Sequence, residues 1–154
     1  MGSVFFTLAA GLELREGTLR LGRWASNPSW WSAAIQFAGT LFFNVNTFDA
    51  MREGLTTQQQ NRLVFAPDLF GSACFLVSGV LAYRAATGPE STMAVNLAGC
   101  VLFGISAVAS YIVPSTGSVL DLAAVNWCTS LGALCFLSGA LMLLPRKSTA
   151  LKEA

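Results

Sequence analysis

The chain of 154 residues contains no histidine, and only 11% of its residues are charged, with 8 acidic and 9 basic side chains. A soluble domain of this size normally carries about a quarter charged residues, because its surface must stay hydrated. The net charge of +1 offers no basic patch to a nucleic-acid backbone. Histidine is the commonest general base and the commonest metal and haem ligand. These deficits exclude a disordered chain, a nucleic-acid-binding protein and most soluble enzymes.

The sequence also lacks the common catalytic signatures. It contains no Gly-x-x-x-x-Gly-Lys-Ser/Thr phosphate loop and no Gly-x-Ser-x-Gly nucleophile elbow, and both lysines lie near the C-terminal end. The cysteines form no Cys-x-x-Cys pair and lie within apolar runs, so we expect small apolar residues rather than disulfides or metal ligands at Cys74, Cys100, Cys128 and Cys135. We therefore predict no catalytic residue, no cofactor and no metal site, and a protein that is not an enzyme.

What the chain does contain is a set of long apolar runs. A bilayer core about 30 Å thick requires about 20 mostly apolar residues in a helix, which satisfies its own backbone hydrogen bonds. Four runs reach that length, approximately at residues 30–51, 64–83, 92–113 and 120–144. Pro67 and Asp68 suit the first turn of the second helix, where a missing N–H costs little and a carboxylate meets the positive end of the helix dipole.

The segment at residues 1–14 is apolar for only about 12 residues before Glu13 and Arg15 interrupt it. It is therefore too short to cross a bilayer alone. It lacks the positive start of a secretory signal, so we do not expect cleavage. Two interpretations stay open. This segment is either an interfacial or partly inserted helix, or a transmembrane helix that lacks its first turns.

The basic residues divide unequally between the two ends of a four-helix zigzag. Seven fall on one side and two on the other, the larger group being Arg15, Arg20, Arg23, Arg84, Arg146, Lys147 and Lys152 and the smaller Arg52 and Arg62. Cytoplasmic loops of membrane proteins carry the excess of Lys and Arg. We therefore predict a multi-pass protein of the plasma membrane with a cytoplasmic C-terminus and with the loop at residues 56–61 outside.

A short motif, Gly-x-x-x-Phe, recurs in every apolar run. Its five copies are Gly2/Phe6, Gly39/Phe43, Gly71/Phe75, Gly99/Phe103 and Gly132/Phe136. A shift of 60 residues aligns WSAAIQFAGTLFF with STMAVNLAGCVLF, and a shift of 61 aligns GSACFLVSG with GALCFLSG after deletion of one residue. The chain thus divides into two tandem hairpins at residues 30–86 and 92–145, preceded by a short helix and linker at 1–29 and followed by a tail at 146–154.

Polar or small residues flank each motif at fixed distances. Three residues before the glycine stand Gln36, Asp68, Asn96 and Thr129, and seven residues after it stand Asn46, Ser78, Ser106 and Gly139. With the glycine and the phenylalanine, these positions fall within an arc of about 80° on one helix face. We interpret this face as a packing stripe, because small residues let membrane helices approach closely and amides bond between them. The alternative is the lining of a pore or a ligand site.

The units GSACFLVSG and GALCFLSG resemble the YrhK-like domains of small bacterial membrane proteins, and the resemblance covers the four main helices. It implies an integral membrane protein and carries over no catalytic residue.

A second set of polar residues falls in the predicted outward-facing half of the helices: Asn44, Asn46, Asp49, Asp68, Asp121 and Asn126. Ionisable groups within membrane helices usually mark a path or a partner. These residues are either a vestibule for cations or protons, or groups at helix ends that reach headgroup water.

Together these features predict an all-α transmembrane helix bundle of four full helices plus a short N-terminal one, built from a duplicated two-helix hairpin. We expect a non-enzymatic structural or interaction module in contact with the lipid bilayer and with a second copy or another membrane protein. The alternative is a small oligomeric transporter or channel with an outward-facing acidic vestibule.

Overall fold

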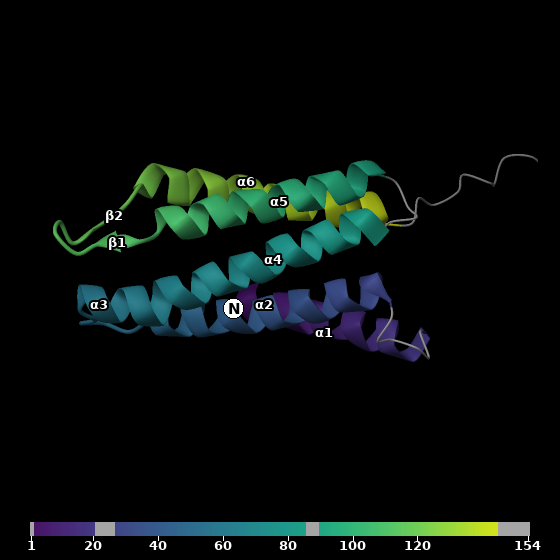
Figure 1. The fold of residues 1–154 in the computed structure, drawn as a ribbon, viewed down its shortest axis with the longest axis horizontal. Coiled ribbons are helices and arrows are strands. Elements are labelled where there is room, and N and C mark those ends of the chain that lie inside the picture. The colour runs from purple at the N-terminus through teal and green to yellow at the C-terminus, as the bar shows by residue number, and fades with distance from the viewer. Residues whose placement is uncertain (1, 21–26, 86–89, 145–154) are drawn as a thin grey trace, which may run out of the picture.

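The computed structural model describes residues 2–20, 27–85 and 90–144, so the predicted basic tail and most of the first linker lie outside the described residues. The chain forms an elongated bundle whose long helices run along one axis (Figure 1). These helices are α1 (Gly2–Arg20), α2 (Pro28–Ala50), α4 (Ala66–Ala85), α5 (Glu90–Ala109) and α6 (Leu122–Leu143). The prediction of a helical bundle is confirmed.

Three helices in the described residues are long and apolar enough to cross a membrane: Thr57–Ala85, Glu90–Ala109 and Leu122–Leu143. They correspond to the second, third and fourth predicted spans. The first predicted span also forms a helix, α2, of 23 residues. It does not belong to this group of three, because the amides of Gln36, Asn44 and Asn46 interrupt its apolar run.

The second predicted span begins earlier than its apolar run suggests. Thr56 and Gln59 form a capping box that starts α3 (Thr57–Gln60). The π-helix η2 (Asn61–Phe65) follows directly and continues into α4, so that Thr57–Ala85 is one helix. The prediction that Pro67 stands at a free helix start is therefore wrong. A π turn, in which the Ala66 N–H bonds to the Asn61 carbonyl, lies directly before this proline and accommodates it inside the helix.

The prediction that the third span extends to residue 113 is also wrong at its end. Helix α5 stops at Ala109, and the connection to α6 contains a two-stranded antiparallel hairpin of β1 (Ile112–Val113) and β2 (Ser118–Val119). Pro114 explains the stop, because it has no N–H and favours extended backbone in the residue before it. The turn closes at Gly117, whose φ of 68° suits glycine. Helix α6 then begins at Asp121, whose Oδ1 accepts a hydrogen bond from the Ala124 N–H at 2.9 Å.

The motif glycines lie where paired helices come closest. A Cβ atom on Gly71 of α4 would lie 3.1 Å from the Gly39 carbonyl oxygen of α2 and 3.1 Å from the Phe43 ring. In the second pair, a Cβ atom on Gly132 of α6 would lie 3.2 Å from the Gly99 carbonyl oxygen of α5. Only glycine permits backbones to approach this closely.

The five motif phenylalanines, one from each long helix, form a single aromatic cluster. Ring centroids lie 4.9 Å apart for Phe43–Phe75, 5.5 Å for Phe6–Phe75, 5.6 Å for Phe103–Phe136 and 6.0 Å for Phe43–Phe103. These distances fall in the range of favourable aromatic pairs. We call this group the phenylalanine cluster; it joins α1 and both hairpins, and its rings line a cavity of about 380 Å³.

The distribution of polarity is the reverse of that in a soluble domain. The largest fully buried side chains are Thr40, Ser72, Ser78 and Thr92, whereas many large apolar side chains, such as Phe5 and Trp127, are exposed. An apolar exterior around a small-residue, hydrogen-bonded interior suits a bundle surrounded by lipid.

Candidate functional site

The six polar residues predicted to form an outer vestibule do not share one cavity. Asn46 and Asp68 lie together, whereas the other four have separate surroundings. The Asn44 Nδ2 donates to Thr7 Oγ1 of α1 at 2.8 Å. Asp49 pairs with Arg52 at 3.3 Å, Asp121 caps α6, and Asn126 is exposed on α6.

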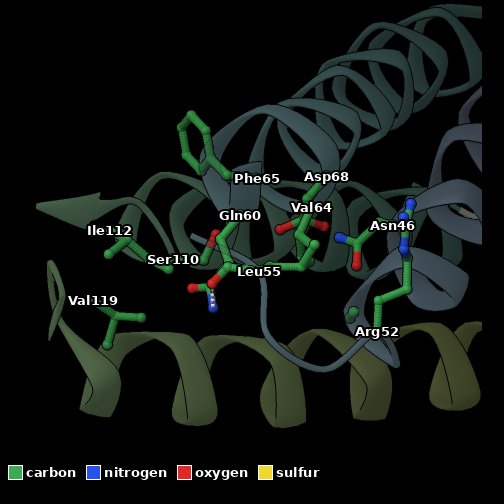
Figure 2. Close-up of a pocket in the computed structure, with 11 residues that line it drawn as sticks. Asn46, Arg52, Leu55, Gln60, Val64, Phe65, Asp68, Ser110, Ile112 and Val119 are labelled. Carbon is green, nitrogen blue, oxygen red and sulfur yellow. Dashed lines mark hydrogen bonds between the residues drawn. The ribbon is translucent and has the colours of Figure 1, made fainter. Parts of the chain in front are cut away.

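Asn46 and Asp68 line a cavity of about 390 Å³ at the end of the bundle that carries α3 and the β-hairpin (Figure 1). Figure 2 shows the lining side chains, which come from α2 and the loop after it, from the helix that starts at α3, from the residue directly after α5 and from the hairpin. We call it the Asp68 cavity, and its lining is Asn46, Ala50, Arg52, Leu55, Gln60, Val64, Phe65, Asp68, Ser110, Ile112 and Val119.

The carboxylate of Asp68 is the central polar group of this cavity. It lies within hydrogen-bonding reach of the side chains of Asn46 and Ser110. The single Ser110 hydroxyl proton, however, also serves the Ala107 carbonyl oxygen, 2.7 Å away. A carboxylate offers about four acceptor positions. The protein therefore supplies fewer donors than Asp68 can accept, and the open side of the carboxylate faces the cavity.

The helix dipole does not explain why an acidic residue stands at position 68. Because α3, η2 and α4 are continuous, the positive end of this helix lies at Thr57, and the dipole acts only within about the first turn. Asp121 is the contrasting case. It caps α6 directly and needs no further role.

The two charged side chains of the cavity lining, Arg52 and Asp68, do not pair with each other. Arg52 and Asp49 form an ion pair at 3.3 Å, with the Arg52 side chain 60% exposed. Among the described residues Asp68 forms no ion pair. The lining thus contains one acidic and one basic side chain, and the basic one is paired with Asp49, which lies outside the lining.

Two contacts hold the outer part of the cavity in place. The Asn61 side chain donates to the Ile112 carbonyl at 2.7 Å and accepts from the Ile112 N–H at 2.9 Å, as a neighbouring strand would. The rings of Phe65 and Tyr111 pack edge to face with centroids 5.2 Å apart. The π-helical segment is thereby fixed to β1, next to Gln60 and Val64 of the lining.

The corresponding positions of the second hairpin hold a different pair of side chains. Asp68 and Asn46 align with Thr129 and Ser106. There the two hydroxyl oxygens lie 2.6 Å apart, and the Ser106 Oγ also donates to the Val125 carbonyl at 3.1 Å. A pair of small hydroxyl groups therefore suffices to join the two helices at this position.

A second polar cavity, of about 470 Å³, lies toward the opposite end of the bundle, with Glu13, Ser32, Gln36 and Asn96 in its lining. The sequence interpretation did not single it out. Gln36 and Asn96 align with each other three residues before their motif glycines, and this shared position was the available signal.

The described residues contain neither a candidate metal site nor a disulfide bond. They contain no group of three His, Cys, Asp or Glu side chains that could hold a metal ion. Cys74, Cys100, Cys128 and Cys135 are free thiols.

The fold and this geometry define a helical bundle with three membrane-length helices and a polar cavity at one end. Comparison with known proteins finds no matching family model, no matching curated protein and no matching solved structure. The resemblance to YrhK-like domains therefore stays a prediction.

Proposed function

We propose that the chain is a multi-pass integral membrane protein of two tandem helical hairpins, α2 with α4 and α5 with α6, with α1 as an additional shorter helix. The duplication is supported by the matching contacts in the two hairpins. In each, the two motif glycines approach each other, and each phenylalanine lies over the glycine of its partner helix. The charge distribution favours a cytoplasmic C-terminus in the plasma membrane.

The role of α2 as a fourth span is supported by the pairing of its amides. The Ser78 Oγ donates to the Gln36 Oε1 at 3.2 Å, the Asn44 Nδ2 donates to Thr7, and Asn46 lies against Asp68. Amides that bond to neighbouring helices are tolerated within a membrane and contribute about 0.6–2 kcal/mol to helix association.

The function supported best is that of a non-enzymatic structural or interaction module, and the phenylalanine cluster is the observation that carries this conclusion. One ring from every long helix converges on it, so the repeated motif is accounted for by packing. The apolar exterior is left to lipid, to a second copy or to another membrane protein.

Native mass spectrometry of the protein released from a mild detergent tests this function. A discrete homo-oligomer, or a complex with another membrane protein, without a bound small molecule supports the module. A monomer without a bound small molecule is compatible with the structural role alone, whereas a discrete homo-oligomer with a bound small molecule contradicts the module and favours transport.

A second candidate is a small oligomeric transporter or channel whose outward-facing vestibule is the Asp68 cavity. The specific observation in its favour is the carboxylate inside a cavity, away from any helix start, where the second hairpin has only hydroxyl groups. Flux of monovalent cations into proteoliposomes, measured for the wild type and for Asp68→Asn, tests it. Equal flux in both proteins contradicts a vestibule centred on Asp68.

A further inference from the structure

We infer that the Asp68 cavity binds a small organic cation, namely a primary ammonium group that carries a short hydrocarbon chain. This inference rests on the second candidate function, the outward-facing vestibule, and gives that vestibule a ligand class.

The first argument is the comparison between the two hairpins. At the equivalent position of the second hairpin, Ser106 and Thr129 close the gap between α5 and α6 with hydroxyl groups 2.6 Å apart. The same position of the first hairpin instead has a carboxylate and an amide beside a cavity of about 390 Å³. A charge taken out of water costs free energy unless it is paired. Packing alone therefore does not account for Asp68.

The second argument is charge. Arg52, the basic side chain of the lining, pairs with Asp49 at 3.3 Å, and Asp68 forms no ion pair within the described residues. The donors around this carboxylate are the Asn46 amide and a Ser110 hydroxyl that the Ala107 carbonyl shares. A cation that brings N–H donors satisfies both the charge and the empty acceptor positions.

The third argument is the chemistry of the walls. Ligand pockets for small molecules have volumes of about 300–1,000 Å³ and are mostly apolar with a few polar groups. The Asp68 cavity fits that description, because Leu55, Val64, Ile112 and Val119 contribute apolar surface beside the polar groups. The described residues offer no group of three acidic or thiol side chains for a bare metal ion. An ammonium group would bind the Asp68 carboxylate, and its hydrocarbon chain would pack against these apolar side chains.

The experiment compares ligand binding by the wild type and by the double variant Asn46→Ser/Asp68→Thr. This variant installs the residue pair of the second hairpin, so it keeps a helix contact that the fold already uses. The probe is n-hexylammonium, with hexanol and hexanoate as neutral and anionic probes of the same length and Na⁺ as an inorganic cation. Binding is measured by calorimetric titration and by the shift of the thermal unfolding midpoint in detergent.

We expect hexylammonium to bind the wild type and raise its unfolding midpoint, and the double variant to bind at least about tenfold more weakly, as expected for the loss of a charge-assisted contact. Asp68→Asn, which keeps the side-chain shape, is expected to show the same loss if the double variant does not fold. Asp121→Asn is the matched control, because this acid caps α6 outside the Asp68 cavity and asparagine caps equally well. Its binding should equal that of the wild type.

Three results overturn the inference, and they differ in whether the cation vestibule is retained. Equal binding of hexylammonium and hexanol, or equal binding by wild type and variant, means partition into apolar surface. Stabilisation by Na⁺ as strong as by hexylammonium overturns the organic class but retains a cation vestibule. No response of the folded wild type to any cation removes the vestibule as well and leaves the packing module.

Discussion

At the scale of single residues, the motif glycines differ in how much space surrounds them. A Cβ atom on Gly132 would lie 2.7 Å from the Phe103 ring, whereas one on Gly2 would meet nothing within 4 Å. The same motif position is thus closely packed in one helix and open in another.

We predict that Gly132→Ala lowers the free energy of unfolding by about 1–3 kcal/mol, the usual cost of overpacking. Gly2→Ala, the control at the matching motif position, should leave stability unchanged. Unfolding in mixed micelles, followed by circular dichroism, measures both. A Gly132→Ala protein as stable as the wild type would show that the Phe103 ring moves aside at little cost.

The residues of the Asp68 cavity differ in how well the sequence indicates them. Asp68 and Asn46 hold fixed positions relative to their motifs, so the repeat identifies them. Ser110 lies one turn beyond Ser106 on the same face, and extending the stripe would have found it. Arg52 and Gln60 follow no such spacing, because their positions depend on contacts between segments distant in the sequence.

At the scale of elements, three of the four apolar runs coincide with membrane-length helices, and the start of the second run and the end of the third are misplaced. The start at Thr57 depends on a capping box in a polar segment and on a π turn before Pro67, neither of which hydropathy detects. The hairpin of β1 and β2 was missed because its strands are apolar and continue the run of α5. Pro114 lies beyond the end of α5, whereas Pro67 lies inside the helix Thr57–Ala85.

The contact between η2 and β1 gives a prediction at this scale. Asn61→Ala removes both hydrogen bonds to Ile112, whose backbone groups then have no strand-like partner on that side. We expect a loss of about 1–3 kcal/mol of stability and faster hydrogen exchange at the Ile112 amide.

Asn126→Ala is the control, since Asn126 is exposed and makes no hydrogen bond within the described residues. Unchanged exchange at Ile112 in Asn61→Ala would contradict the role of Asn61 in holding the cavity's outer part.

At the scale of the whole molecule, the phenylalanine cluster connects α1 and both hairpins. Phe75 lies near its centre, is only 3% exposed and contacts the rings of Phe6, Phe43 and Phe136. We predict that Phe75→Ala costs about 3–5 kcal/mol, as for other buried aromatic truncations. Phe70→Ala on the same helix, with Phe70 59% exposed, should cost much less. Thermal unfolding in detergent compares the two, and equal losses would contradict a central cluster.

On the proposed membrane location, the arrangement of the bundle accounts for the motif that both hairpins share. Lipid provides no hydrophobic drive between helices, so close backbone contact and internal hydrogen bonds must hold them together. Each hairpin meets this need with glycine, phenylalanine and paired polar groups.

Membrane topology is the most direct test of the account. Single cysteines are introduced at Gly54 and Thr116 at one end of the bundle and at Ser29 and Ser91 at the other, after replacement of the four native cysteines. Intact cells are treated with a membrane-impermeant maleimide before and after permeabilisation. We predict labelling at 54 and 116 from outside, and at 29 and 91 only after permeabilisation. Labelling of 29 and 54 from the same side would contradict α2 as a span and, with it, the two-hairpin membrane bundle.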